Sequence, residues 1–131
     1  MGDDLNRITE QVIKAAIEVH RELGPGLLES VYQRCMEIEL GSMGLKFQSQ
    51  LPVKIVFRGV EVPDDAFRMD LLVEGEVVVE LKSAELVKPV NKKQLLTYLK
   101  LAKKPLGLLI NFNEVLLKDG ITRITNQRHC D

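Results

Sequence analysis

Hydrophobic residues recur at helical spacing at the start of the chain. Over residues 5–23, apolar side chains lie three or four positions apart, which predicts an amphipathic helix that ends at Gly24-Pro25-Gly26. A second helical pattern covers residues 28–42. The stripe that we expect to face the core consists of Leu28, Val31, Cys35 and Ile38.

The pattern then changes to the two-residue period of β-strands. From residue 45 to 57, apolar side chains recur at odd positions with a break at Ser49, which indicates one or two half-buried strands, with Pro52 at an edge or a bend. Arg58-Gly59 predicts a turn, and residues 60–62 predict a short return strand. Two further apolar runs, 69–73 and 77–81, flank Glu74-Gly75-Glu76, which is typical of a β-hairpin.

The remainder of the chain continues this alternation of strands and helices. A helix is predicted over residues 90–102 after Pro89, and the apolar run 106–112 suits a strand in the interior of a sheet. Residues 116–124 predict a last small hairpin that turns at Asp119-Gly120, and residues 125–131 predict a flexible polar tail. Together the elements predict one α/β domain over residues 1–131, with a mixed β-sheet flanked by helices.

The hairpin at residues 69–81 carries the candidate chemistry. If its turn is centred on Gly75, residues whose numbers sum to 150 face each other, so Asp70 lies opposite Glu80. Lys82 points to the same face, and Val77, Val79 and Leu81 point to the core. Two buried carboxylates are costly without partners, and a divalent cation between them would remove their repulsion. The alternative is a solvated outer face with a Glu–Lys ion pair, and spacing alone favours neither interpretation.

Composition excludes several classes of protein. The chain has 131 residues, of which 45% are hydrophobic and 28% charged, as in ordinary globular domains. No apolar run approaches the roughly 20 residues of a membrane span, and the acidic N-terminus lacks the apolar core of a signal peptide. Cys35 and Cys130 show no metal or redox spacing, which fits a reducing, cytoplasmic setting, and Cys35 is expected in the core.

The net charge of −1 hides an asymmetry. Residues 1–80 carry 8 Lys and Arg against 15 Asp and Glu, whereas residues 81–131 carry 10 against 4. A basic block beside acidic ligands is typical of a metal-dependent phosphodiester site. The alternative is that these lysines simply lie solvated on an exposed helix.

Several residues of the chain resemble, in order and spacing, the motifs of the PD-(D/E)xK nuclease superfamily. The matching positions are Asp70, Glu80-Leu81-Lys82, Gln94 and Tyr98. Residues 26–32, GLLESVY, look like the signature of the small bacterial GxxExxY proteins, a branch of that superfamily. The resemblance runs from about residue 20 to residue 123. It departs at Met69, where the motif has a proline; that proline is often absent in the superfamily and is not a ligand.

The resemblance implies a restriction-endonuclease-like core and a metal-dependent nuclease. Mg²⁺ or Mn²⁺ would be held by Asp70, Glu80, the carbonyl group of Leu81 and Glu29. Lys82 would orient or deprotonate the attacking water, and Gln94 would position Lys82 or the phosphate. Without the resemblance, Glu29 is an acid favourably placed near the positive end of a helix dipole, and Gln94 is ordinary helix surface.

A nuclease also requires a nucleic-acid partner; the sequence does not decide between DNA and RNA, and DNA is the expectation. Backbone contacts would come from Lys88, Lys92, Lys93 and Lys100, and Tyr32 and Tyr98 would support the site. A catalytically silent module of the same fold, binding nucleic acid or a protein, is the alternative, because fold does not fix function. The complete Asp-Glu-Lys set argues against such a degenerate site. A metal-binding or dimeric scaffold is a third hypothesis, and a symmetric homodimer is plausible for so small a chain.

Overall fold

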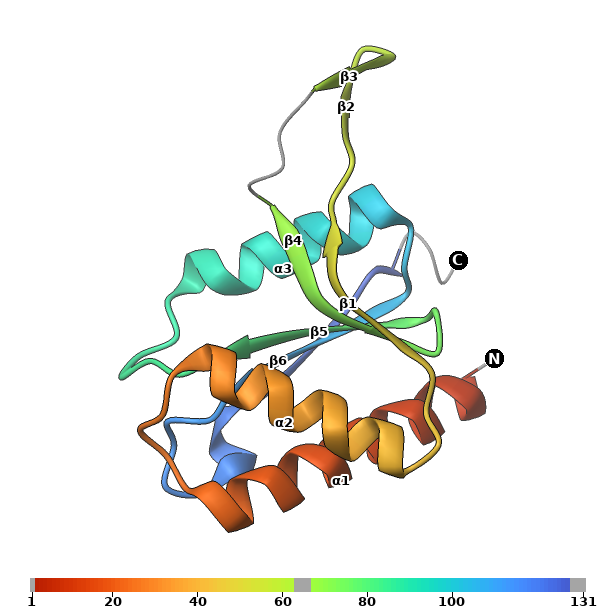
Figure 1. Cartoon of the computed structure of the whole chain (residues 1–131). Helices are drawn as coiled ribbons and strands as arrows, with labels where there is room; N and C mark the ends of the chain where they lie inside the picture. Colours follow the sequence, from red (N-terminus) through yellow and green to blue (C-terminus); the bar gives the residue numbers. More distant parts are fainter. Residues whose placement is uncertain (1, 63–66, 128–131) are drawn as a thin grey trace.

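A five-stranded mixed sheet forms the centre of the protein. The computed structural model describes residues 2–62 and 67–127 (Figure 1). The sheet has the strand order β1-β4-β5-β6-β7, in which β5 and β6 are parallel and the other neighbours antiparallel. Its strands are β1 (Phe47–Pro52), β4 (Arg68–Val73), β5 (Val77–Lys82), β6 (Leu106–Asn111) and β7 (Ile121–Thr125). The predicted α/β class is confirmed, and Pro52 ends an edge strand as expected.

Helices cover both faces of the sheet. Helices α1 (Gly2–Leu23) and α2 (Glu29–Ser42) lie on one face, and α3 (Pro89–Ala102), which connects β5 to β6, lies on the other (Figure 1). Val77, Val79 and Leu81 belong to the core cluster under α1 and α2, as predicted, whereas Val78 packs with the buried residues of α3. Burial on both faces explains why β6 is apolar along almost its whole length. No helix among the described residues is long and apolar enough to cross a membrane.

Helix α2 buries a different stripe from the one predicted. Tyr32, Met36 and Leu40 are fully buried, whereas Leu28 is 74% and Ile38 56% exposed. Two apolar stripes therefore lie side by side on this helix, about 100° apart. The ring of Tyr32 stacks on Phe112 at 4.4 Å between centroids, and this aromatic contact with the residue that follows β6 favours the observed orientation.

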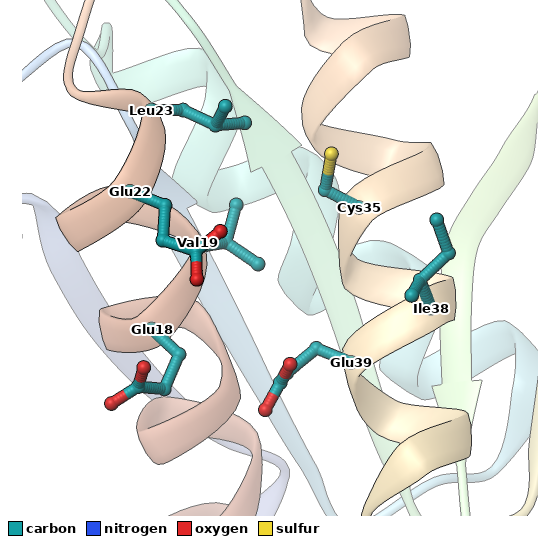
Figure 2. A pocket seen from close by; sticks show the side chains of 7 residues that line it. All are labelled: Glu18, Val19, Glu22, Leu23, Cys35, Ile38 and Glu39. Carbon is teal, nitrogen blue, oxygen red and sulfur yellow. The ribbon is translucent and has the colours of Figure 1, made fainter.

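Cys35, predicted to be a core residue, is only half-buried at the margin of the core. It lines a groove of about 210 Å³ between α1 and α2, shown in Figure 2. The other lining residues are Glu18, Val19, Glu22, Leu23, Ile38 and Glu39. None of the residues with predicted chemistry lines this groove, so the candidate site lies elsewhere.

The C-terminal region corrects two predictions. Residues 116–117 do not form a strand, because Leu117 begins the short 3₁₀ helix η1 (Leu117–Gly120), and β7 pairs with β6 instead. Thr125 ends β7, and Asn126 is buried with its Nδ2 donating to the carbonyl oxygens of Leu99 (3.3 Å) and Lys104 (3.1 Å). Of the predicted tail, Thr125 is therefore part of the sheet and Asn126 is buried. Residues 128–131, which include Cys130, lie outside the described residues.

A separate two-stranded ribbon extends from the body of the protein. It consists of β2 (Ile55–Phe57) and β3 (Val60–Val62), which pair antiparallel (Figure 1). The predicted turn at Arg58-Gly59 is confirmed, with φ angles of 51° and 79°, the conformation that the hairpin turn requires.

Candidate active site

The pairing of β4 with β5 changes at the two predicted carboxylates. The ladder contains Leu71–Val79, Leu72–Val78 and Val73–Val77, which confirms the predicted register. Beyond Leu71–Val79, hydrogen bonds between side chains and backbone replace the regular ladder. Both strands continue past this point, to Arg68 in β4 and to Lys82 in β5.

Asp70 and Glu80 each bind the backbone of the other strand. The N–H of Asp70 donates to Glu80 Oε2 at 2.8 Å, and the N–H of Leu81 donates to Asp70 Oδ2 at 2.7 Å. Each carboxylate thus takes the place of a carbonyl acceptor. Because each carboxyl group is held by a short hydrogen bond to the backbone of the other strand, the two groups lie fixed beside each other.

Burial makes this pair electrostatically costly. Glu80 is only 8% exposed, and its pKa is raised to about 8, first by burial and then by the negative charge of Asp70. The pKa of Asp70 is also raised, mainly by burial. The positive charge of Lys82, at the end of β5, lowers both pKa values without offsetting burial.

The alternative of a solvated outer face with a Glu–Lys ion pair is wrong. Glu80 is buried, and none of the ion pairs in the described part of the chain includes Lys82. The pair therefore lies in an environment where ionised carboxylates need further compensation.

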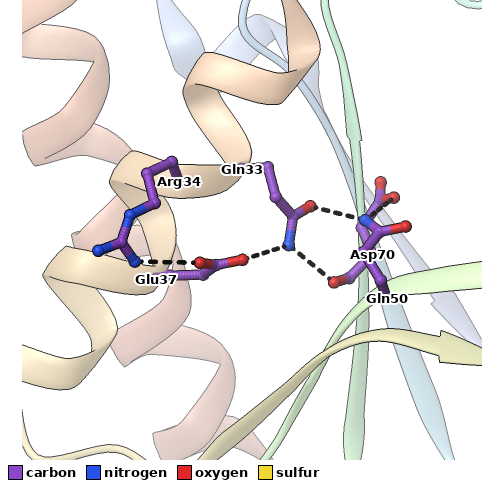
Figure 3. Close-up of polar contacts among 5 residues, drawn as sticks. All are labelled: Gln33, Arg34, Glu37, Gln50 and Asp70. Atoms are coloured by element: carbon purple, nitrogen blue, oxygen red, sulfur yellow. Dashed lines mark hydrogen bonds and ion pairs between the residues drawn. The ribbon is translucent and has the colours of Figure 1, made fainter.

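A chain of amide groups connects Asp70 to α2 (Figure 3). Gln50 of β1 donates through Nε2 to Asp70 Oδ1 and to Gln33 Oε1, both at 3.2 Å. Gln33 donates through Nε2 to the Asp70 carbonyl oxygen at 2.9 Å and to Glu37 Oε2 at 3.1 Å. Burial raises the pKa of Glu37, but hydrogen bonds from Gln33, Ser49 and Arg34 outweigh it and lower the pKa overall.

The sequence analysis missed Gln33 and Gln50. Gln50 has a φ of 51°, a left-handed conformation that is uncommon for a residue other than glycine. It lies between the pairs Ser49–Leu71 and Leu51–Met69, next to Asp70. Strained backbone of this kind concentrates at functional sites. The one signal in the sequence was the break in the two-residue period at Ser49.

Glu29 lies near the pair but is not joined to it. It is the exposed first residue of α2, and its charge is the smallest of the influences that raise the pKa of Glu80, of which burial is the largest. Within residues 2–62 and 67–127, no group of three or more Asp, Glu, His or Cys residues is placed to hold a metal ion.

Tyr32 holds the turn that precedes α2. Its hydroxyl group donates to the Gly24 carbonyl at 2.6 Å and accepts from Leu27 N–H at 3.2 Å.

Helix α3 brings Tyr98 to the carboxylates. Tyr98 is buried, and its pKa is raised by burial and then by the charges of Glu80 and Asp70. Gln94 is half-buried one turn earlier on the same side of the helix.

The lysines predicted to contact nucleic acid are all exposed. They are Lys88, Lys92, Lys93 and Lys100. Helix geometry places Lys93 and Lys100 on a different side of α3 from Gln94 and Tyr98.

The donor set suits a hard divalent cation. Asp70 and Glu80 supply carboxylate oxygens, and the carbonyl group of Leu81 projects to the same side of β5 as its N–H, toward Asp70. Mg²⁺ is commonly bound through one or two carboxylates while it keeps several waters. A cation would also neutralise the repulsion between the two buried acids. The residues present therefore fit Mg²⁺ or Mn²⁺, although they do not form a closed cage.

Comparison with protein families places the chain in a known group. Residues 6–124 match the family described as the PD-(D/E)XK nuclease superfamily. Neither the curated proteins nor the solved structures give a match. The matched region contains Asp70, Glu80 and Lys82 together with all five strands of the main sheet except Thr125. The chain thus belongs to the PD-(D/E)XK nuclease superfamily.

Proposed function

We propose that this protein hydrolyses phosphodiester bonds of nucleic acid with the help of Mg²⁺ or Mn²⁺. The observation that carries the proposal is the pair of buried Glu80 and half-buried Asp70 beside Lys82, because two crowded acids with raised pKa values are costly and are typical of functional sites. Membership of the nuclease superfamily supports it. The narrower assignment to the GxxExxY branch, suggested by residues 26–32, belongs to the same proposal.

Each residue of the candidate active site would have a distinct role in the reaction. Asp70, Glu80 and the Leu81 carbonyl would hold the cation, with Glu29 contributing directly or through water. When bound, the cation would stabilise charge on the phosphate and lower the pKa of a bound water. Lys82 would orient the attacking water and stabilise negative charge that develops on the phosphate. Gln94 would position Lys82 or the phosphate.

Two groups of residues would support this chemistry. Gln33 and Gln50 would keep Asp70 in place, because they bind its carbonyl and its Oδ1. The exposed lysines of the α3 region would contact the nucleic-acid backbone without reading bases, and DNA is the proposed partner. These are Lys88, Lys92, Lys93 and Lys100.

A catalytically silent module that binds nucleic acid or a protein is the second candidate. It is favoured by one observation, that Glu29 is exposed and the described residues supply two clustered acids rather than three. In this case the cation would bind only weakly, or only with a phosphate that completes its ligands.

Substitution of Lys82 tests the choice between these functions. Labelled single-stranded and duplex DNA are incubated with wild type and Lys82→Ala in Mg²⁺ and in Mn²⁺. We expect cleavage by the wild type and a loss of roughly 100-fold or more in the variant, the usual contribution of a residue that acts on the reacting proton or charge. Lys118→Ala, which removes an exposed lysine of η1, is the matched control and should cleave normally.

Circular dichroism establishes that both variants are folded. Cleavage by Lys82→Ala at the wild-type rate would contradict the catalytic assignment. DNA binding without cleavage by the wild type in either metal would favour the silent module.

A further inference from the structure

Asn111 is the last residue of β6 and its polar exception. Residues 106–110 of the strand carry only apolar side chains and one glycine, yet the Asn111 side chain is just as deeply buried, at 1% exposure. A buried amide group is costly unless its polar atoms have partners. In the parallel pairing of β5 with β6, Asn111 is the partner of Lys82. The two side chains therefore leave the same face of the sheet next to each other.

The side-chain amide of Asn111 binds the turn that follows Lys82. Its Oδ1 accepts from the N–H of Ala84 at 3.1 Å, and its Nδ2 donates to the Ala84 carbonyl at 2.9 Å. The same Oδ1 accepts from the N–H of Asn113 at 3.2 Å. Because one amide group binds both backbone groups of Ala84, it holds this residue in one position and one orientation.

Lys82 is thereby fixed on both sides. Before it, the N–H of Leu81 donates to Asp70 Oδ2 at 2.7 Å. The carbonyl of Lys82 itself accepts from the N–H of Phe112 at 2.8 Å, and the turn after it is held by Asn111. The described residues offer Lys82 no ion pair, so the direction of its side chain depends on the backbone that carries it and on the side chain beside it.

We propose that Asn111 is a positioning residue for Lys82. It fixes the backbone from which the lysine extends, and with it the place of the ammonium group beside the two carboxyl groups of the site. Asn111 itself contacts neither cation nor substrate. The inference rests on the proposed function, which assigns Lys82 to the attacking water and the phosphate. A displacement of about 1 Å in a reacting group can lower a rate roughly 100-fold.

The simpler alternative is that Asn111 only supplies partners for the backbone of the turn. Its loss would then lower stability and leave the reaction of the folded protein unchanged. A comparison of kcat, KM and cation affinity separates the two roles, because a purely structural residue moves none of them in a protein that is still folded.

Steady-state cleavage of a labelled DNA duplex in Mn²⁺ provides this comparison. In Asn111→Ala we expect kcat to fall about 10-fold or more, because the lysine is no longer held in place. KM and the affinity for Mn²⁺, measured by calorimetry, should stay within about threefold of wild type. Asp70 and Glu80 keep their own backbone partners in this variant, so the cation site is preserved.

Asn126→Ala is the matched control. Asn126 is also a buried asparagine, 4% exposed, and its Nδ2 donates to the carbonyls of Leu99 and Lys104. Its N–H donates to the carbonyl of Pro105, directly before β6, so it lies at the opposite end of this strand from Asn111. The control should lose stability, as Asn111→Ala does, and keep kcat.

NMR relaxation of the lysine ε-methylene groups tests the same contact without catalysis. In the cation-free wild type, Lys82 should be more ordered than the exposed Lys118. The order of Lys82 should fall in Asn111→Ala and remain in Asn126→Ala. Asn111→Ser keeps a small polar group that cannot bind both groups of the turn, and it takes the place of Asn111→Ala if that variant does not fold.

An unchanged kcat in a folded Asn111 variant would overturn the proposal, as would an unchanged order of Lys82. An equal fall of kcat in Asn126→Ala would overturn it too, because the rate would then follow stability alone. A wild type that cleaves no duplex contradicts the nuclease function by itself. The relaxation comparison then still decides the role of Asn111: a Lys82 that gains motion supports it, and a Lys82 that stays ordered refutes it.

Discussion

Glu80 lies in an environment that ordinary strand residues do not meet. It is buried beside a second carboxylate, and its pKa of about 8 means that it keeps a proton at neutral pH when no cation is present. Burial is the larger cause and Asp70 the second. Binding of a cation beside Glu80, or a rise in pH, would therefore remove this proton and leave Glu80 negatively charged.

The first prediction concerns pH and stability. Glu80 loses its proton near the ordinary value of 4.5 in the unfolded chain and near 8 in the folded protein. Between these values the folded state binds more protons, so the free energy of unfolding falls as pH rises, by up to about 1.4 kcal/mol per pH unit. Asp70, whose pKa is raised in the same direction, adds to this slope. In Glu80→Gln the contribution of Glu80 disappears.

Urea denaturation in the absence of divalent cations measures this effect. The stability of Glu80→Gln relative to wild type should grow as pH increases from 4.5 toward 8. Glu39→Gln, at the groove between α1 and α2, is a control that should follow the wild type. Parallel pH curves for wild type and Glu80→Gln would contradict the environment described for Glu80.

At the residue scale, the sequence predicts which residues of neighbouring strands lie close together, but it does not predict which of them are buried. The turn at Gly75 and the two-residue period were sufficient to predict the register of β4 with β5. Just beyond the paired residues, Asp70 and Glu80 each bind the backbone of the other strand. The same pattern fits a solvated face, and only the position of α3 over this face decides the matter. Gln33 and Gln50 were missed because their contacts with Asp70 span 37 and 20 residues, and no local period reports such contacts.

Helices and strands show where local patterns are ambiguous. The strands, the turn at Arg58-Gly59 and helix α3 follow from spacing alone. Helix α2 does not, because it carries two apolar stripes and the choice depends on Phe112, which lies far away in the sequence. Likewise, β7 pairs with β6 across a nine-residue connection rather than with its predicted neighbour at residues 116–117.

Gly107 of β6 lets α3 approach the sheet closely. A substitution at this position therefore tests how tightly α3 packs on β6. A Cβ atom on Gly107 would lie 2.9 Å from Cδ1 and 3.1 Å from Cγ of Leu95, so this fully buried side chain would have to shift. Gly107→Ala should lower the free energy of unfolding by about 1–3 kcal/mol, the usual cost of overpacking. Because Tyr98 belongs to the same helix, the change should also disturb the candidate site.

Thermal and urea denaturation of Gly107→Ala and of the control Gly41→Ala measure these changes in the free energy of unfolding. In Gly41→Ala, the added Cβ would meet only Phe47 at 4.0 Å, so stability should stay the same or rise by up to about 1 kcal/mol, given the helical position. Equal stability of Gly107→Ala and wild type would show that α3 packs less tightly than described.

On the scale of the whole molecule, α3 and α1 lie on opposite faces of the sheet. The exposed lysines of the α3 region lie on one face, and α1 with its exposed Lys14 covers the other. If nucleic acid binds along α3, Lys92→Glu/Lys93→Glu should weaken DNA binding and reduce its dependence on salt, by about one unit of slope for each phosphate that the variant no longer neutralises.

Fluorescence anisotropy of a labelled duplex over a range of NaCl concentrations measures both quantities. The matched control is Lys14→Glu, which should change affinity little. An equal loss of affinity in both variants would indicate that DNA responds to overall charge and not to the α3 surface.

The central claim, that Asp70 and Glu80 form a cation site, is tested most directly by calorimetric titration of Mg²⁺ and Mn²⁺. Wild type, Asp70→Asn/Glu80→Gln and the control Glu18→Gln/Glu39→Gln are compared, alone and with a non-cleavable DNA duplex, whose phosphates can complete the ligands. We predict binding by the wild type and the control, and none by the Asp70/Glu80 variant. Equal binding by all three proteins, or no binding by the wild type even with the duplex present, would contradict the account.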